Sequence, residues 1–217
     1  MASAEVQRAI ANDRDLKLHL ASGENMLLRD SLGRITPPDS GAVVVMDVRT
    51  GEVISMVSSP TYDPNIFTER LLTRDWRRLQ EHPRNPLLNR VTAGAYAPGS
   101  TFKMVVALAA LEAGIISEKT RHFCNGSMDL GNRTFHCWFE DGHGSMNVIK
   151  ALERSCDVFF YEVALKTGIQ RIKNMALRLG LGFPTGIDIP GEKPGIIPSH
   201  DWKLATHGVV WTPGETV

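Results

Sequence analysis

The chain has 217 residues, enough for one substantial domain. Its 24 basic and 24 acidic residues balance and form no basic run, so nothing indicates a nucleic-acid partner. No stretch approaches the roughly 18 apolar residues of a membrane span, and residues 1–7 lack the apolar core of a signal peptide.

The first 40 residues are predicted to precede the main domain. Residues 1–20 have the pattern of a short amphipathic helix, and residues 21–40 are polar and end in Pro37-Pro38-Asp39-Ser40. We interpret residues 1–40 as a linker or as the remnant of a preceding domain.

A strand hairpin is predicted next. Residues 41–47 and 53–58 are short apolar runs, and residues 48–52 between them have the composition of a tight turn. Strands this apolar are expected in a sheet that helices cover. Residues 66–90 are charged and helical in pattern, and we interpret them as a solvated connector.

The segment Ala97-Pro-Gly-Ser-Thr-Phe-Lys103 is the centre of the functional hypothesis. Its Pro-Gly pair indicates a turn, and residues 101–113 predict a helix that is apolar on nearly every side and therefore buried. Ser100 and Lys103 are spaced to share one face at the start of this helix. A serine becomes a nucleophile when a base takes its proton, and a lysine serves where burial or a helix N-terminus lowers its pKa. The alternative is a capping serine beside a lysine that reaches solvent.

A second polar motif lies further along. Residues 145–147 are predicted to precede one long helix, with apolar positions from Val148 to Leu165 and an end at Gly168. Ser155-Cys156-Asp157 lies within it. By itself, this motif is better explained as the polar face of a helix. Residues 169–180 predict a further helix that ends at Gly180.

The cysteines form a possible metal-binding set. There are three, Cys124, Cys137 and Cys156, so at least one thiol is unpaired within the chain. With His143 they make a Cys₃His set, a preferred zinc shell, although the spacing is not that of a zinc finger. The residues alone leave zinc open beside buried thiols or one disulfide. Two nearby histidines, His122 and His136, are alternative ligands.

Several of these segments carry a family resemblance. Residues 90–103 closely resemble the active-site serine segment of class B penicillin-binding proteins, the D,D-transpeptidases that cross-link peptidoglycan and share an S-x-x-K motif. Residues 41–65, ending in Tyr-Asp-Pro-Asn, resemble the first hairpin of that domain. Trp211-Thr-Pro-Gly-Glu215 resembles a later segment. Ser155-Cys-Asp157 has the S-x-D form of the elongation type, penicillin-binding protein 2. Ala97 departs from the family, which often has proline there.

The resemblance covers residues 41–217 and implies the fold. We expect an α/β (α+β) fold of the serine β-lactamase and penicillin-binding transpeptidase type, with an antiparallel sheet flanked by helices. The family's K-T-G motif lies on a strand, whereas Lys166-Thr167-Gly168 ends a predicted helix. We therefore interpret the chain as the N-terminal portion of the domain, without its K-T-G part and poorly active, with an open sheet edge exposed.

The resemblance also assigns roles to four residues. It implies that Ser100 is the nucleophile, Lys103 the base, Ser155 a proton relay and Asp157 a positioning group. The main-chain N–H of Ser100 is expected to form half of the oxyanion hole.

A zinc ion is implied in the same way. Some elongation-type members have a zinc site of Asp, His and Cys residues between the serine helix and the S-x-D helix. Cys137, His143 and Cys156 match three of its positions, and Cys124 takes the fourth, where others have aspartate. We expect a structural zinc that pins residues 120–145 to the S-x-D helix.

The implied substrates are peptidoglycan stem peptides, and β-lactam antibiotics acylate the same serine. In the full-length protein the resemblance implies a membrane glycosyltransferase of the elongation complex as partner, at the periplasmic face of the bacterial inner membrane. We expect the family's membrane anchor to be absent from this chain. Two alternatives remain: a non-catalytic sensor of β-lactams or muropeptides, and a zinc-stabilised scaffold with a vestigial site.

Overall fold

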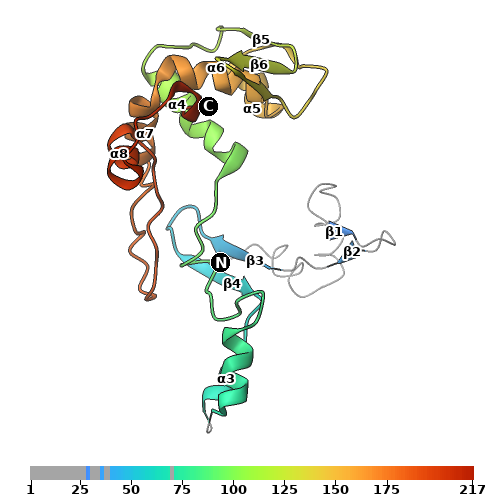
Figure 1. Cartoon of the computed structure of the whole chain (residues 1–217), viewed down its shortest axis with the longest axis vertical. Coiled ribbons are helices and arrows are strands. Elements are labelled where there is room, and N and C mark those ends of the chain that lie inside the picture. Colours follow the sequence, from blue (N-terminus) through green and yellow to red (C-terminus); the bar gives the residue numbers. More distant parts are fainter. Residues whose placement is uncertain (1–27, 30–34, 37–39, 69–70) are drawn as a thin grey trace. The chain divides into compact units, whose positions relative to one another are not determined.

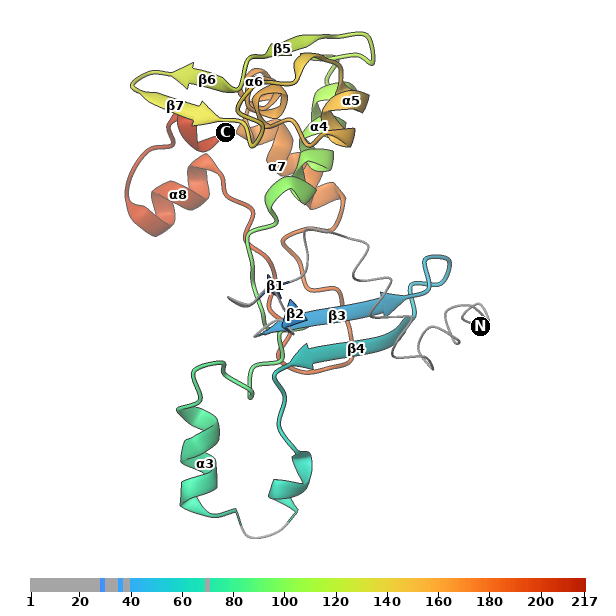
Figure 2. The same cartoon turned by 90° about the vertical axis from the view of Figure 1, so that its right-hand side faces the viewer.

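The computed structural model describes residues 28–29, 35–36, 40–68 and 71–217. The chain divides into two compact units, residues 1–94 and 95–217, and Figures 1 and 2 show their elements from two sides. The helix predicted for residues 1–20 lies outside the described residues. Within the described part, no helix has the length and apolarity needed to cross a membrane.

The first unit contains the predicted hairpin. Strands β3 (Gly41–Met46) and β4 (Val53–Ser59) pair antiparallel and confirm both predicted strands (Figure 2). The turn between them is held by the Asp47 carboxylate, which accepts a hydrogen bond from the main-chain N–H of Arg49 at 2.8 Å. The other elements described in this unit are β1 (Leu28–Arg29), β2 (Ile35–Thr36), the 3₁₀ helix η1 (Pro64–Phe67) and α3 (Thr73–Gln80).

Apolar side chains are exposed on both faces of the hairpin. Val43 and Val57, which pair across the hairpin, are more than half exposed, and Val44, the next residue of β3 and hence on the other face, is also exposed. Among the described strands, β3 and β4 pair only with each other. The predicted open edge is therefore present among the described strands.

The second unit packs three helices around one core. These are α4 (Lys103–Glu112), α6 (Asp157–Thr167) and α7 (Ile169–Arg178), and α4 contacts both of the others (Figure 2). Ala110 of α4 and Phe159 of α6 are fully buried. The small side chains of α4 allow this close approach, because interiors pack without voids.

One face of α4 departs from the prediction. Met104, Leu108 and Leu111 are exposed, and their spacing places them on a single stripe of the helix. The expected burial on nearly every side is therefore wrong for this stripe, since α6 and α7 pack on the opposite side.

The long helix predicted from Val148 is two helices. Helix α5 (Val148–Glu153) is capped by Asn147, whose side chain accepts a hydrogen bond from the Lys150 N–H, and α6 begins at Asp157. The residues between them, Arg154–Cys156, break the helix. Gly168 ends α6 at φ 80°, as predicted, and α7 confirms the helix expected after it.

Short strands lie over α6. They pair as two antiparallel ladders, and the strands that contact α6 are β5, β6 and β7 (Figure 1). The four strands are β5 (His122–Cys124), β6 (Ser127–Leu130), β7 (Arg133–His136) and β8 (Gly144–Met146). The remaining elements are η2 (Gly99–Phe102), α8 (His200–His207) and η3 (Pro213–Glu215).

Candidate functional site

Ser100 lies on a 3₁₀ turn that leads directly into α4. Gly99 begins η2 at φ 55°, a left-handed conformation that glycine adopts without a steric penalty. The main-chain N–H of Lys103 donates to the carbonyl of Ser100, which places the two residues on one turn. Ser100 is exposed and Lys103 is half-buried. A substrate therefore has access to the hydroxyl while the amine is sheltered.

The Lys103 amine reaches the second polar motif. Its Nζ donates to the Ser155 carbonyl at 2.8 Å and to Ser155 Oγ at 3.1 Å, and it lies 2.5 Å from Asp157 Oδ1. An ammonium has three N–H groups, and these three acceptors match that number. Phe160 adds its ring, with the centroid 5.8 Å from Nζ. The structure thus joins Lys103 to both predicted polar residues of the S-x-D motif.

Ser155 is held in an unusual backbone conformation. Its φ is +51°, in the left-handed region that non-glycine residues seldom enter. Such strain costs on the order of 1–3 kcal/mol and persists where surrounding contacts impose it. It breaks the long predicted helix and turns the Ser155 carbonyl and hydroxyl toward Lys103. Sequence periodicity does not predict such a turn, because the turn depends on hydrogen-bond donors that are distant in sequence.

Asp157 is bonded through both carboxylate oxygens. Oδ1 faces Lys103, and Oδ2 accepts a hydrogen bond from the main-chain N–H of Trp138 at 2.9 Å. The Trp138 indole Nε1 also donates to the Arg154 carbonyl at 3.0 Å. No sequence pattern singles out Trp138, because its two hydrogen bonds depend on its place beside this turn.

The four predicted metal ligands lie together. The ligand atoms of Cys124, Cys137, His143 and Cys156 are all within 4.8 Å of one another. His143 Nδ1 lies 3.4 Å from Cys137 Sγ and 3.8 Å from Cys124 Sγ. All three cysteines are buried and are free thiols. A tetrahedral zinc with bonds of about 2.0–2.3 Å separates its ligand atoms by roughly 3.4–3.8 Å, and both His143–sulfur distances fall in this range.

The environment of these groups opposes charge on at least one thiol. Burial, together with the neighbouring Cys124, raises the pKa of Cys156 to about 12. Burial lowers the pKa of His143, which favours its neutral, metal-binding form. The pKa of Cys137 is lowered: burial raises it, but hydrogen bonds from main-chain N–H groups, Phe139 first, outweigh that effect. A bound cation would stabilise all three thiolates.

The two alternative histidines lie outside this set. His122 pairs through Nδ1 with the Glu162 carboxylate and packs edge-on against Phe159. His136 is exposed, and its carbonyl accepts a hydrogen bond from the Tyr161 hydroxyl at 3.2 Å. Neither belongs to the metal-type group found among the described residues.

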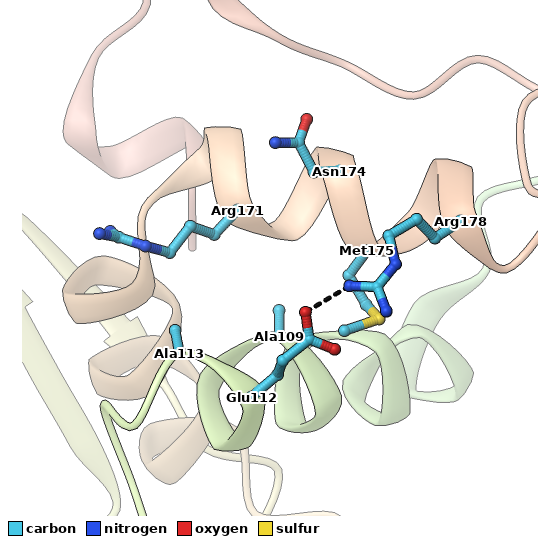
Figure 3. A pocket seen from close by; sticks show the side chains of 7 residues that line it. All are labelled: Ala109, Glu112, Ala113, Arg171, Asn174, Met175 and Arg178. Atoms are coloured by element: carbon cyan, nitrogen blue, oxygen red, sulfur yellow. Dashed lines mark hydrogen bonds and ion pairs between the residues drawn. The ribbon is translucent and has the colours of Figure 1, made fainter.

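A shallow hollow of about 310 Å³ lies elsewhere in this unit, between α4 and α7 (Figure 3). Arg178 pairs there with Glu112, and Arg171 donates to the Thr167 carbonyl. Neither Ser100 nor Lys103 lines it. The chemistry of the chain is therefore concentrated at the Lys103–Asp157 contact rather than in this hollow.

Lys166-Thr167-Gly168 is placed as the sequence predicted, at the end of α6 rather than on a strand. Thr167 is fully buried and its hydroxyl donates to the Val163 carbonyl at 2.7 Å. This string therefore belongs to the end of the helix and not to a strand.

Comparisons with known proteins agree with the geometry. Residues 41–215 match the family model described as the penicillin binding protein transpeptidase domain. The peptidoglycan D,D-transpeptidase MrdA of Escherichia coli K12 is 42% identical over 178 residues, which are 81% of this chain but only 28% of that protein. The chain thus spans less than a third of the length of that relative.

Solved structures show the same relationship. Pseudomonas aeruginosa PBP2, solved in complex with WCK 5153, has a TM-score of 0.76 and 40% identity, with 82% of this chain and 41% of that chain covered. Helicobacter pylori PBP2, solved in complex with MreC, has a TM-score of 0.79 and 30% identity, with 88% of this chain and 41% of that chain covered.

Proposed function

Because this chain belongs to the penicillin-binding protein transpeptidase family, we propose that Ser100 is the nucleophile of a peptidoglycan D,D-transpeptidase of the elongation type. One observation carries the proposal: the Lys103 amine, one turn from Ser100, bonds to both Ser155 and Asp157. A capping serine with a solvent-directed lysine does not require that contact.

The proposed reaction begins with attack of Ser100 Oγ on the carbonyl of a stem peptide's D-Ala-D-Ala bond. In its neutral form, the Lys103 amine takes the hydroxyl proton, and the three acceptors around Nζ stabilise the ammonium that forms. The main-chain N–H of Ser100 is one proposed donor to the oxyanion. The C–N bond then breaks, leaving an acyl-serine.

The leaving D-Ala amine needs a proton, and Ser155 is placed to pass it on. Its Oγ lies 3.1 Å from the Lys103 amine, so a proton moves from Lys103 through the hydroxyl to the departing nitrogen. An amine of a neighbouring stem peptide then attacks the acyl-serine carbonyl and gives its proton to Lys103. The bond from that carbonyl to Ser100 Oγ breaks, the proton passes from Lys103 to Ser100, and the cross-link is left between the two peptides. Penicillin would acylate the same hydroxyl.

A fluorescent penicillin tests this assignment. The chain and its Ser100→Ala variant are incubated with the reagent, and the adduct is located by mass spectrometry. We expect an adduct at Ser100 in the unmodified chain and none in the variant. An adduct on both, or on neither, would contradict the role of Ser100. A stable adduct without cross-linking of stem peptides would favour the sensor.

We further propose a structural zinc held by Cys124, Cys137, His143 and Cys156. The supporting observation is the donor set itself, three buried sulfurs and a His Nδ1 whose atoms all lie within 4.8 Å of one another. Cys156 lies between Ser155 and Asp157, so an ion bound there would fix the S-x-D turn. Elemental analysis near zero zinc, together with three free thiols by titration, would exclude the ion.

The assembly and location of the parent protein are proposals of the same kind. The Helicobacter PBP2 relative is seen in complex with MreC, and we propose an elongation complex, including a membrane glycosyltransferase, as the partner of this domain. Stem peptides lie outside the cytoplasm, which places the domain at the periplasmic face of the inner membrane. Co-purification of the full-length protein with the glycosyltransferase tests the partner.

A further inference from the structure

Trp138 binds both ends of the turn that carries the polar groups of the site. Its indole Nε1 donates to the carbonyl of Arg154, immediately before Ser155. Its main-chain N–H donates to the side chain of Asp157. Lys103 binds the same turn through the Ser155 carbonyl and the other Asp157 oxygen. With the Ser155 hydroxyl, which also accepts from Lys103, two donors on Trp138 and one amine hold the turn through five acceptors.

We propose that Trp138 is a positioning residue for the site. Its indole N–H holds the Arg154 carbonyl and thereby keeps Ser155 in the left-handed conformation that directs its hydroxyl to Lys103. Its main-chain N–H fixes the Asp157 carboxylate. The role in acylation rests on the proposed function, whereas the hold on the turn does not.

The exposure of the ring supports this role. Trp138 is 64% exposed, so its burial adds little to the core. The ring also lies beside His143, with centroids 5.4 Å apart, and Trp138 directly follows Cys137. Trp138 therefore lies between the Cys₃His set and the turn, and it stabilises this region mainly through its hydrogen bonds.

A single substitution isolates the indole N–H. Trp138→Phe keeps an aromatic ring and the main-chain donor but removes Nε1. Trp211→Phe is the matched control, because the Trp211 Nε1 donates to Thr216 Oγ1 at 2.9 Å, away from the turn. Both variants lose one indole hydrogen bond of similar length, and only the first lies at the site.

Hydrogen exchange measures the hold on the turn. The N–H groups of Ser155 and Cys156 donate to the carbonyls of Leu152 and Ala151. Trp138→Phe should speed their exchange by about 5- to 10-fold, the effect of losing one hydrogen bond, and leave α7 unchanged. Trp211→Phe should leave the turn unchanged. Unchanged exchange at the turn in Trp138→Phe overturns the proposal.

A measurement on the unmodified chain covers the case in which the variant does not fold. With ¹⁵N-labelled indoles, the Trp138 Nε1 proton should exchange with solvent about tenfold more slowly than a free indole, because it is bonded. Exchange at the rate of a free indole overturns the proposal without any variant.

The rate of acylation then distinguishes a positioning role of Trp138 from a purely structural one. The rate constant for acylation by fluorescent penicillin should fall about tenfold in Trp138→Phe, with an unchanged Kd of the preceding non-covalent complex. A loosened turn with an unchanged rate constant shows a purely structural residue and overturns the positioning role. Absence of any adduct on the unmodified chain contradicts the proposed function instead, and hydrogen exchange still decides the hold on the turn.

Discussion

Lys103 and Asp157 join the N-terminal ends of two helices through an ion pair of 2.5 Å. The side chains are 12% and 19% exposed, so solvent screens the pair only in part. An acid in the first turn of α6 is favoured by the helix dipole, but a base at the start of α4 is not. Lys103 therefore does not stabilise its own helix, and its position is explained by what it contacts.

Asp157→Asn should weaken both the fold and the chemistry. The pair is partly sheltered, so we expect a loss of about 1–3 kcal/mol in unfolding free energy, between the values for exposed and buried pairs. The acylation rate constant should fall at least about tenfold, since the Lys103 ammonium loses its counter-charge. Chemical denaturation and penicillin labelling measure the two effects. Asp188→Asn, at an exposed position, is the control, and equal behaviour of both variants would contradict the role of Asp157.

The zinc proposal predicts different results for two histidines. His143→Ala should lose the ion and, in the presence of zinc, lower the unfolding free energy by about 3 kcal/mol or more, a fall in Tm of roughly 6–12 °C. His136→Ala removes an exposed imidazole from the adjoining hairpin and should change neither quantity. Zinc content by elemental analysis and a thermal scan check both variants. Equal zinc content in the two would refute the ligand set.

Local sequence patterns predict many of the helices and strands but not the contacts between residues distant in sequence. The spacing of apolar residues predicts strands β3 and β4 and helix α7. The glycine at position 168 predicts the end of α6. The spacing of Ser100 and Lys103 follows from helix geometry. The break at Ser155 and the place of Trp138 do not, because both depend on bonds between residues distant in sequence. The exposed stripe on α4 was also missed, since an apolar sequence does not say which faces find a partner.

Ser155 allows strain and chemistry to be separated. Ser155→Gly removes the hydroxyl and also the left-handed penalty, whereas Ser155→Ala removes only the hydroxyl. We expect the glycine variant to be more stable than the alanine variant by about 1 kcal/mol, and both to lose most acylation activity. Denaturation curves give the stability difference. An alanine variant as stable as the glycine variant would show that the turn stores no strain, and full activity in either would remove the proton relay.

Acid should weaken the segment that ends in η3. The hydrogen bond from Lys203 lowers the pKa of Glu215 to about 2, from an ordinary value of 4.5. A lowered carboxyl pKa stabilises the fold above pH 4.5, and that contribution is lost as the pH falls from 4.5 toward 2. Glu215→Gln should therefore show a shallower fall of Tm across this window than the unmodified chain. Glu118→Gln is the control, and parallel curves for all three proteins would contradict the linkage.

We expect Gly142 to be required for zinc binding by the Cys₃His set. A Cβ built there would lie 2.5 Å from the Cys124 carbonyl oxygen and 2.6 Å from the Asn125 carbonyl carbon, and the residue has φ +78°. Main-chain atoms cannot move aside as a flexible side chain does, so Gly142→Ala must displace either Cys124 or the adjacent His143. We expect this variant to lose zinc.

Gly131→Ala is the matched control for this last variant. Its φ of +62° gives a similar left-handed penalty of about 1 kcal/mol, but nothing lies within 4 Å of the added Cβ. Its zinc content should therefore equal that of the unmodified chain. Elemental analysis of the two variants therefore measures the effect of the Cβ clash on zinc content, because the backbone strain is nearly the same in both. Full zinc in Gly142→Ala would mean that the close contact with Cys124 does not hold the ligands, while loss in both would assign the effect to backbone strain alone.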